Sequence, residues 1–522
     1  MQPRPWPAHL PAGTAFAADE LTARGSLPAA WASTWSDRER APLLVEASGA
    51  GQRWCSAGEF EERTRRLALA LRDRGIVPGQ RIVWSTTSSL AAVAVNVAAL
   101  RAGVVVVPVN PDYTARELAH IVGDVGPVAA VVDDPARATV LAELGAGRLT
   151  VFDCGLRVLH DAGRPSGAPS GPAAGGAGAG PADLDVVGPG DPALVAYTSG
   201  TTGRPKGAVL THANLLANSE AVAMTWRWGP GDRLVHALPI FHGHGLCVAL
   251  YTSLLRGSSV VLLPRFEAAA VADACDRFDA TMFFGVPTMY HRLVRSGRAG
   301  DLGRLRLAVS GSAPLSAELH GEVQAASGLT VLERYGMTET LMTLSNPYDG
   351  ERRAGTVGFP FPGVEARVDE DGAGAGGEIL VRGPAVFRGY WERPEATEAA
   401  FAGGWFHTGD LAVVEDGYVR ILGRASDLII SGGYNVYPAE VEDVVLGLPG
   451  VAEVAVTGTP SEEWGEVVTA WVVPDGSTPL AAEEVLAYAA PRLAPYKRPR
   501  RVCIVDSLPR NALGKVQRSE LR

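Results

Sequence analysis

The segment YTSGTTGRPKG, residues 197–207, concentrates glycine, hydroxyl and lysine side chains at the end of an apolar run. Glycines let the backbone turn so that successive N–H groups point at one anion, and the hydroxyls add further donors. Lys206 adds a positive charge but, unlike a P-loop lysine, it lies between Pro205 and Gly207. We therefore predict a phosphate-binding loop of another type, against the alternative of a surface turn without function.

Four more charged residues occur in segments suited to nucleotide chemistry. Glu339, in GMTET, offers the anionic oxygen that a phosphate-bound Mg²⁺ needs. Asp410 ends HTGD, and its two oxygens can accept both hydroxyls of a ribose, to which Arg424 can also donate. Lys515 lies in the polar segment RNALGKVQR, where a lysine is usually only solvated.

Together these segments resemble the motifs of the adenylate-forming superfamily, which includes acyl-CoA synthetases, adenylation domains of peptide synthetases, and luciferases. The resemblance covers nearly the whole chain, in order. Besides the phosphate loop, the matching segments are SGSAPL (310–315, adenine side), ERYGMTET (333–340, nucleotide and magnesium), HTGD (407–410) with GR (423–424) (ribose), SGGYNVYPAEVE (431–442, CoA tunnel) and PRNALGK (509–515, catalytic lysine).

The resemblance implies a role for each matching residue. It implies nucleotide binding by Thr198, Ser199, Gly200, Thr201, Thr202, Gly203, Lys206, Gly311, Ser312, Glu333, Arg334, Tyr335, Gly336, Met337, Thr338, Asp410 and Arg424. It implies catalysis by Lys206, His242, Glu339 and Lys515, Mg²⁺ binding by Thr198 and Glu339, and CoA binding by Ser431, Gly432, Gly433 and Tyr434.

The implied reaction has two halves. A carboxylate attacks the α-phosphorus of ATP, giving an acyl-adenylate and pyrophosphate, and a CoA thiolate then attacks the acyl carbonyl and releases AMP. Positioning and electrostatics supply most of such catalysis. The resemblance implies that a small domain rotates about residues 424–427, presenting Lys515 first and the segment from Ser431 second. Ser426 replaces the lysine or aspartate of many relatives, which leaves the hinge residue open.

The stretch MFFGVPTMYHRL, residues 282–293, places Arg292 among residues typical of a core. A buried guanidinium needs a negative partner, either an Asp or Glu of the protein or a ligand carboxylate. GVPTMYHR, FHGHGL and ERYGMTETLM resemble malonyl-CoA synthetases, in which the matching arginine binds the second carboxylate of malonate. The resemblance therefore implies a malonyl-CoA synthetase whose substrate site contains Arg292, His242, Gly243, His244, Met342 and Ser310.

Gly243 stands where relatives can carry a larger residue such as threonine. The smaller residue predicts a wider pocket near C2 of the acid, and hence tolerance of methylmalonate. The alternatives are a synthetase for another short acid, an adenylating enzyme that loads a carrier-protein thiol, and a non-catalytic nucleotide-binding relative.

Helical and β-rich patterns alternate along residues 58–130 and again from 210 to 264, which predicts an α/β fold with mixed or parallel sheets flanked by helices. We predict a large N-terminal domain over residues 1–423 and a small mobile α+β domain over 424–522. The low-complexity segment 163–182 predicts a flexible surface loop.

At 522 residues the chain is too long for one core, and its net charge of −10 argues against a nucleic-acid partner. Five scattered cysteines indicate reduced thiols, and prolines interrupt the N-terminal segment where a signal peptide needs an apolar run. Asn96, Arg101 and Gly103 interrupt the apolar region 89–109, which predicts a buried helix and strand and not a membrane span. We predict a cytoplasmic protein with no membrane partner, of open oligomeric state.

Overall fold

The computed structural model describes residues 6–10, 14, 16–47, 53–161, 184–198, 205–370, 376–461, 463–477, 479–510 and 515–521. The predicted flexible loop 163–182 lies outside the described residues. So do residues 199–203 of the phosphate loop and residues 511–514 before Lys515.

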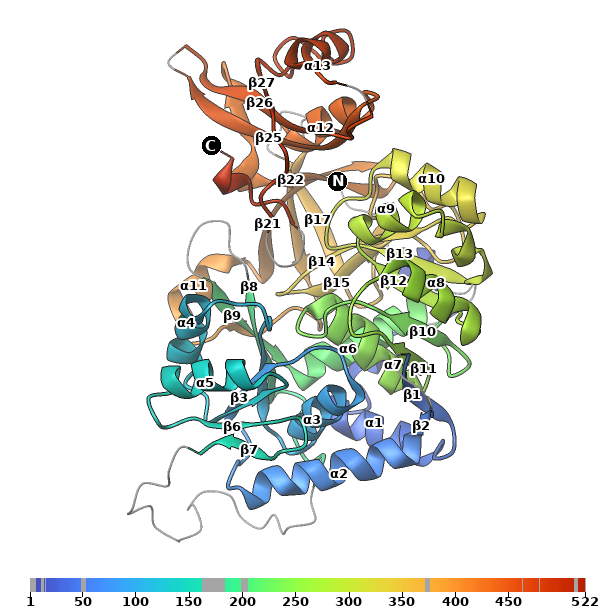
Figure 1. Ribbon diagram of the computed structural model, residues 1–522, viewed down its shortest axis with the longest axis vertical. Coiled ribbons are helices and arrows are strands. Elements are labelled where there is room, and N and C mark those ends of the chain that lie inside the picture. The colour runs from blue at the N-terminus through green and yellow to red at the C-terminus, as the bar shows by residue number, and fades with distance from the viewer. Residues whose placement is uncertain are drawn as a thin grey trace.

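Two large sheets form the framework of the chain before residue 391 (Figure 1). The first has the order β16-β15-β14-β13-β12-β10-β11-β1-β2, and its strands β1, β11, β10, β12, β13 and β14 run parallel. Its strands are β1 (Pro42–Glu46), β2 (Cys55–Ser56), β10 (Arg233–His236), β11 (Ser259–Leu262), β12 (Met282–Gly285), β13 (Leu307–Ser310), β14 (Leu332–Met337), β15 (Leu341–Ser345) and β16 (Phe359–Pro360).

The second large sheet has the order β19-β9-β8-β4-β3-β5-β6-β7, with a parallel centre and antiparallel edges. Its strands are β3 (Arg81–Ser85), β4 (Val105–Pro108), β5 (Ala129–Val132), β6 (Thr150–Phe152), β7 (Val158–His160), β8 (Pro192–Thr198), β9 (Lys206–Thr211) and β19 (Gly389–Tyr390). Every residue of β4 and β5 is buried, because helices cover both faces of a parallel sheet.

Helices separate and cover these sheets. Helix α3 (Leu90–Arg101) and β4 are the buried helix and strand predicted for residues 89–109, and one apolar core joins α3 to strands of both sheets. No helix in the described part of the chain is long and apolar enough to cross a membrane. The other α-helices before residue 424 are α1 (Leu27–Ser36), α2 (Ala57–Asp73), α4 (Ala115–Val125), α5 (Pro135–Leu144), α6 (His212–Thr225), α7 (Thr252–Arg256), α8 (Ala268–Arg277), α9 (Pro287–Arg295), α10 (Ala317–Ser327) and α11 (Pro394–Ala400).

Two smaller sheets follow. An antiparallel sheet contains β17 (Glu365–Glu370), β18 (Gly377–Arg382), β20 (Phe401–Ala402), β21 (Trp405–Glu415) and β22 (Tyr418–Arg424). The last sheet contains β23 (Ile429–Ser431), β24 (Tyr434–Val436), β25 (Val451–Ser461), β26 (Gly465–Pro474) and β27 (Arg501–Ile504).

The last sheet packs with α12 (Pro438–Leu446) and α13 (Ala482–Ala489) around an apolar core of its own. Figure 1 shows this small unit at one end of the molecule. The predicted α/β class, with a large N-terminal part and a small C-terminal part, is confirmed. The domain boundary at residues 423 and 424 stays a prediction.

Candidate active site

The hairpin of β8 and β9 carries the predicted phosphate loop at its turn. Thr198 and Lys206, the last and first residues of these strands, face each other in the antiparallel register. The Lys206 Nζ atom lies 5.1 Å from the ring centre of Tyr390. The Tyr390 hydroxyl donates a hydrogen bond of 3.0 Å to Glu339 Oε1. Tyr390 therefore links the two charged residues, a contact that the sequence analysis missed.

Glu339 is buried, and burial raises the pKa of its carboxyl group. A nearby cation would oppose this shift and hold the group ionised. The described residues contain no cluster of three or more His, Cys, Asp or Glu side chains that could hold a metal. A single carboxylate beside a phosphate loop fits Mg²⁺, which takes few protein ligands and completes its shell with water and phosphate oxygens.

A second cluster of polar side chains surrounds Asp410. Asp410 lies opposite Arg424 in the β21–β22 hairpin, with 2.7 Å between Asp410 Oδ1 and Arg424 Nε. The Tyr335 hydroxyl donates to Asp410 Oδ2 at 2.5 Å, and Thr408 accepts from Arg424 Nη1 through its carbonyl at 3.2 Å. Because a carboxylate has about four acceptor sites, Asp410 retains capacity for a ribose hydroxyl.

The Lys515 side chain is exposed to solvent. Even so, the surrounding protein partly desolvates its ammonium group and lowers its pKa, and the charge of Arg424 lowers the pKa further. Burial raises the pKa of Asp410 and lowers that of His242, and at both groups the charge of Lys515 acts to lower the pKa. The structure therefore brings the lysine of the C-terminal segment to the ribose-side cluster and to the predicted acyl site.

The predicted CoA-binding residues make their contacts inside the last sheet. Ser431 is buried and pairs with Gly465 of β26, and the Gly432 N–H donates to the Trp464 carbonyl at 2.9 Å. Gly433 follows at a positive φ of 83°, and the exposed Tyr434 stacks on Tyr496 with ring centres 4.9 Å apart.

The adenine-side residues follow the carboxyl ends of two parallel strands. Ser310 ends β13 and is in register with Glu333 of β14, after which Gly311 and Ser312 begin a loop. The Leu315 N–H donates to Glu333 Oε1 at 3.0 Å, and burial raises the pKa of Glu333 to about 8. Further along, Gly336 and Met337 end β14 and Thr338 begins the turn to β15.

The predicted acyl-side histidines adjoin this loop. His242 and Gly243 precede a π-helix, η3 (His244–Tyr251), and such helices often mark functional sites. His244 Nδ1 lies 3.4 Å from Ser312 Oγ. Burial, and then the charges of Arg334 and Lys515, lower the pKa of His242 to about 4. This histidine is therefore neutral at physiological pH.

The two remaining residues predicted to bind the acid substrate are Met342 and Arg292. Met342 lies beside Gly336, because a Cβ atom added to that glycine would be 2.9 Å from Met342 Cε. Arg292 is exposed, so the expected core setting is wrong. Helix α9 buries Met289, Tyr290 and Leu293, and Arg292 falls on the flank of that face. No ion pair of Arg292 occurs in the described part of the chain, so the alternative of a protein partner also lacks support.

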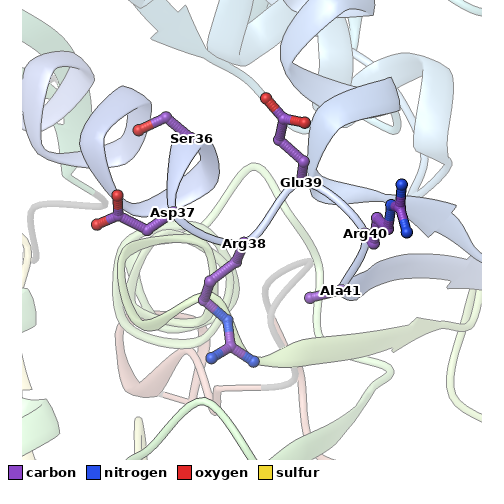
Figure 2. Close-up of a pocket in the computed structure, with 6 residues that line it drawn as sticks. All are labelled: Ser36, Asp37, Arg38, Glu39, Arg40 and Ala41. Atoms are coloured by element: carbon purple, nitrogen blue, oxygen red, sulfur yellow. The ribbon is translucent and has the colours of Figure 1, made fainter.

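Figure 2 shows a surface pocket in the turn between α1 and β1. One chain segment, residues 36–41, lines it, and none of the predicted site residues belongs to that segment. The pocket therefore adds nothing to the site described above.

The chain is similar to known proteins over most of its length. A family model described as AMP-binding enzyme matches residues 31–391, and one described as AMP-binding enzyme C-terminal domain matches residues 440–515. A feruloyl-CoA synthase from an Amycolatopsis species is 38% identical over 484 residues, 89% of this chain and 92% of that protein.

Two solved structures are also similar over nearly their whole length. ATP-bound MatB from Rhodopseudomonas palustris is 41% identical with a TM-score of 0.85, covering 95% of this chain and 98% of that one. A malonyl-CoA ligase in a ternary product complex with methylmalonyl-CoA and AMP is 40% identical with a TM-score of 0.62, covering 97% of this chain and 100% of that one.

Proposed function

The chain belongs to the family of AMP-binding enzymes, and we propose that it is an ATP-dependent malonyl-CoA synthetase that also accepts methylmalonate. As an AMP-forming acid–CoA ligase it uses ATP and CoA as co-substrates, together with Mg²⁺. The choice of acid rests on the polar acyl side of the site. There, burial and then the charge of the buried Arg334 lower the pKa values of His242 and His244. An aryl acid such as ferulate would bind better in a pocket lined by apolar side chains.

The proposed residues act by placing charges around the reacting groups. Lys206 and the phosphate loop hold the β- and γ-phosphates, and Asp410 with Arg424 holds the ribose. Thr198 and Glu339 would hold a Mg²⁺ ion, which when bound would supply charge neutralisation at the phosphates. Lys515 neutralises the charge that develops between the attacking carboxylate and the α-phosphate. After rotation about residues 424–427, the segment from Ser431 to Tyr434 takes the place of Lys515 and admits the CoA thiol.

The assignment is tested by pyrophosphate release across a panel of acids, with and without CoA. We expect malonate to give the highest kcat/KM, methylmalonate to fall within about a hundredfold of it, and malonyl-CoA to form when CoA is present. A higher kcat/KM for ferulate would refute the malonate assignment. Adenylation without transfer to free CoA would favour a carrier-protein thiol. The cytoplasmic location predicted from the sequence stays a prediction.

Gly243 offers a direct test of the methylmalonate prediction. A Cβ atom added at Gly243 would meet no atom of the described residues within 4 Å, so this position has room for a side chain, and we expect Gly243→Thr to fill space that the methyl group of methylmalonate would take. We expect kcat/KM for methylmalonate to fall by about 10–100-fold, while that for malonate changes less than about threefold. Gly321→Thr, also helical and facing open space, is the matched control. Equal loss for both acids would refute the assigned role.

A further inference from the structure

Helix α4 contacts the chain on both sides of the phosphate loop. His120 Nε2 donates a hydrogen bond of 2.8 Å to the Pro205 carbonyl oxygen, near the end of the loop. One turn further along the helix, Asp124 Oδ2 accepts from the Tyr197 hydroxyl at 2.7 Å, at the start of the loop. Residues four apart lie on the same face of a helix. Figure 1 shows this helix beside the β8–β9 hairpin, and one of its faces therefore contacts both ends of the loop.

Asp124 has a second partner, from the far side of β9. Its Oδ1 atom accepts from Arg393 Nη2 at 2.7 Å, and the Asp124 side chain is only 12% exposed. Arg393 lies three residues after Tyr390, whose ring lies near Lys206 Nζ and whose hydroxyl donates to Glu339. One carboxylate therefore joins the start of the phosphate loop to the segment that contacts the lysine at its end.

A glycine leaves room for the Tyr197 side chain. Gly207 is opposite Tyr197 in the β8–β9 register, and a Cβ atom added to Gly207 would lie 2.6 Å from Val195 Cγ1 and 3.3 Å from Tyr197 Cζ. The Trp391 N–H donates to the Gly207 carbonyl at 2.7 Å, on the other edge of the same strand. Burial, and then the hydrogen bond to Asp124, raise the pKa of Tyr197, so its hydroxyl keeps its proton and remains a donor.

The hydrogen bond of Tyr197 also sets the direction of its neighbour Thr198. Successive residues of a strand point to opposite faces. Because Asp124 holds Tyr197 on the face of α4, this alternation directs Thr198 to the other face, where it is in register with Lys206. By its charge alone a carboxylate near a phosphate loop opposes the binding of an anion, and Arg393 offsets that charge. The place of Asp124 therefore favours a role in geometry.

We propose that Asp124 is a positioning residue for ATP, which acts through Tyr197 and Arg393 to hold Thr198 and Lys206 where the β- and γ-phosphates bind. The proposal rests on the phosphate-binding role proposed above for the loop and is independent of which acid is activated. Because the loop holds the β- and γ-phosphates, the contacts of Asp124 affect the binding of ATP and leave the binding of AMP unchanged. They also affect the first half-reaction alone, since pyrophosphate has left before CoA reacts.

The first test compares Tyr197→Phe with the matched variant Tyr418→Phe. Each removes one hydroxyl, and that of Tyr418 donates to the Glu351 carbonyl at 2.9 Å. In Tyr197→Phe we expect the Kd for ATP, measured with Mg²⁺ and without acid, to rise about tenfold, while the Kd for AMP changes less than about twofold. In Tyr418→Phe both Kd values should stay within about twofold of wild type. The Tm of each variant should stay within about 5 °C of wild type.

A double-mutant cycle tests whether Tyr197 acts through Asp124. Asp124→Ala should lower kcat/KM for ATP in ATP–pyrophosphate exchange by about 30-fold, and adding Tyr197→Phe should lower it less than about threefold further. Asp124→Asn keeps an acceptor for the tyrosine hydroxyl, so it should retain more activity than Asp124→Ala. Transfer of a supplied acyl-adenylate to CoA should stay within about twofold of wild type in all of these variants.

Two results would overturn the proposal. One is an equal rise of the Kd values for ATP and AMP in Tyr197→Phe, which would indicate general loosening of the fold. The other is full additivity of Tyr197→Phe and Asp124→Ala. Lys206→Met distinguishes failure of the proposed function. If Lys206→Met leaves the Kd for ATP unchanged, the loop does not bind phosphate and both proposals fail. If it raises this Kd and Tyr197→Phe does not, only the role of Asp124 fails.

Discussion

Lys515→Ala is expected to slow formation of the acyl-adenylate by about 10²–10³-fold, while transfer of a supplied acyl-adenylate to CoA stays within about threefold of wild type. The lysine is placed by the C-terminal segment near Asp410 and His242, where two negatively charged reactants meet. A fixed cation there stabilises charge that develops only in the first half-reaction. ATP–pyrophosphate exchange measures that step, and consumption of the acyl-adenylate with CoA measures the second.

A neighbouring cation provides the control. Arg510 belongs to the same segment and pairs with Glu453 at 2.9 Å, so Arg510→Ala should change adenylation less than about threefold. Because burial lowers the pKa of Lys515, the alkaline decline of wild-type adenylation should begin below pH 10.5, the ordinary lysine value, and should be absent from the residual activity of Lys515→Ala. Equal losses in both half-reactions would contradict the role given to Lys515.

Local patterns can indicate local geometry. The glycine-rich segment after an apolar run predicted a phosphate-binding loop, and the structure pairs Thr198 with Lys206 in the two antiparallel strands on either side of that segment. The alternation of helix and strand likewise predicted the α/β class. It did not predict that β1 pairs with β11, about two hundred residues away, because strand order depends on packing between distant segments.

The errors concern properties that no short segment contains. Whether Arg292 is buried depends on which face of α9 meets the core, and its place at the edge of the apolar face left it in solvent. Tyr390 contacts Glu339 from 51 residues away, in a segment with no recognisable pattern. Among the described residues Arg334 Nε and Nη2 have no hydrogen-bond partner, and this too depends on everything that packs around the side chain.

Asp410→Ala should weaken both ATP binding and the fold. The substitution leaves the partly buried Arg424 and the Tyr335 hydroxyl without their acceptor, so we expect the free energy of unfolding to fall by about 3 kcal/mol in urea denaturation. Arg424→Met alone should also destabilise, and the double variant should lose less than the sum of the two. Glu415→Ala, which breaks the exposed pair with Arg420 in the same hairpin, should cost at most about 1 kcal/mol.

Nucleotide analogues distinguish ribose binding from structural support by Asp410. Two charge-assisted hydrogen bonds to the ribose hydroxyls, at about 1.5–3 kcal/mol each, predict a fall of at least a hundredfold in kcat/KM for ATP in Asp410→Ala. Wild type should show a similar fall when 2′,3′-dideoxy-ATP replaces ATP, and Asp410→Ala should show little further loss with that analogue. If the variant instead lost equal activity on both nucleotides, Asp410 would act only by holding Arg424 and Tyr335 in place.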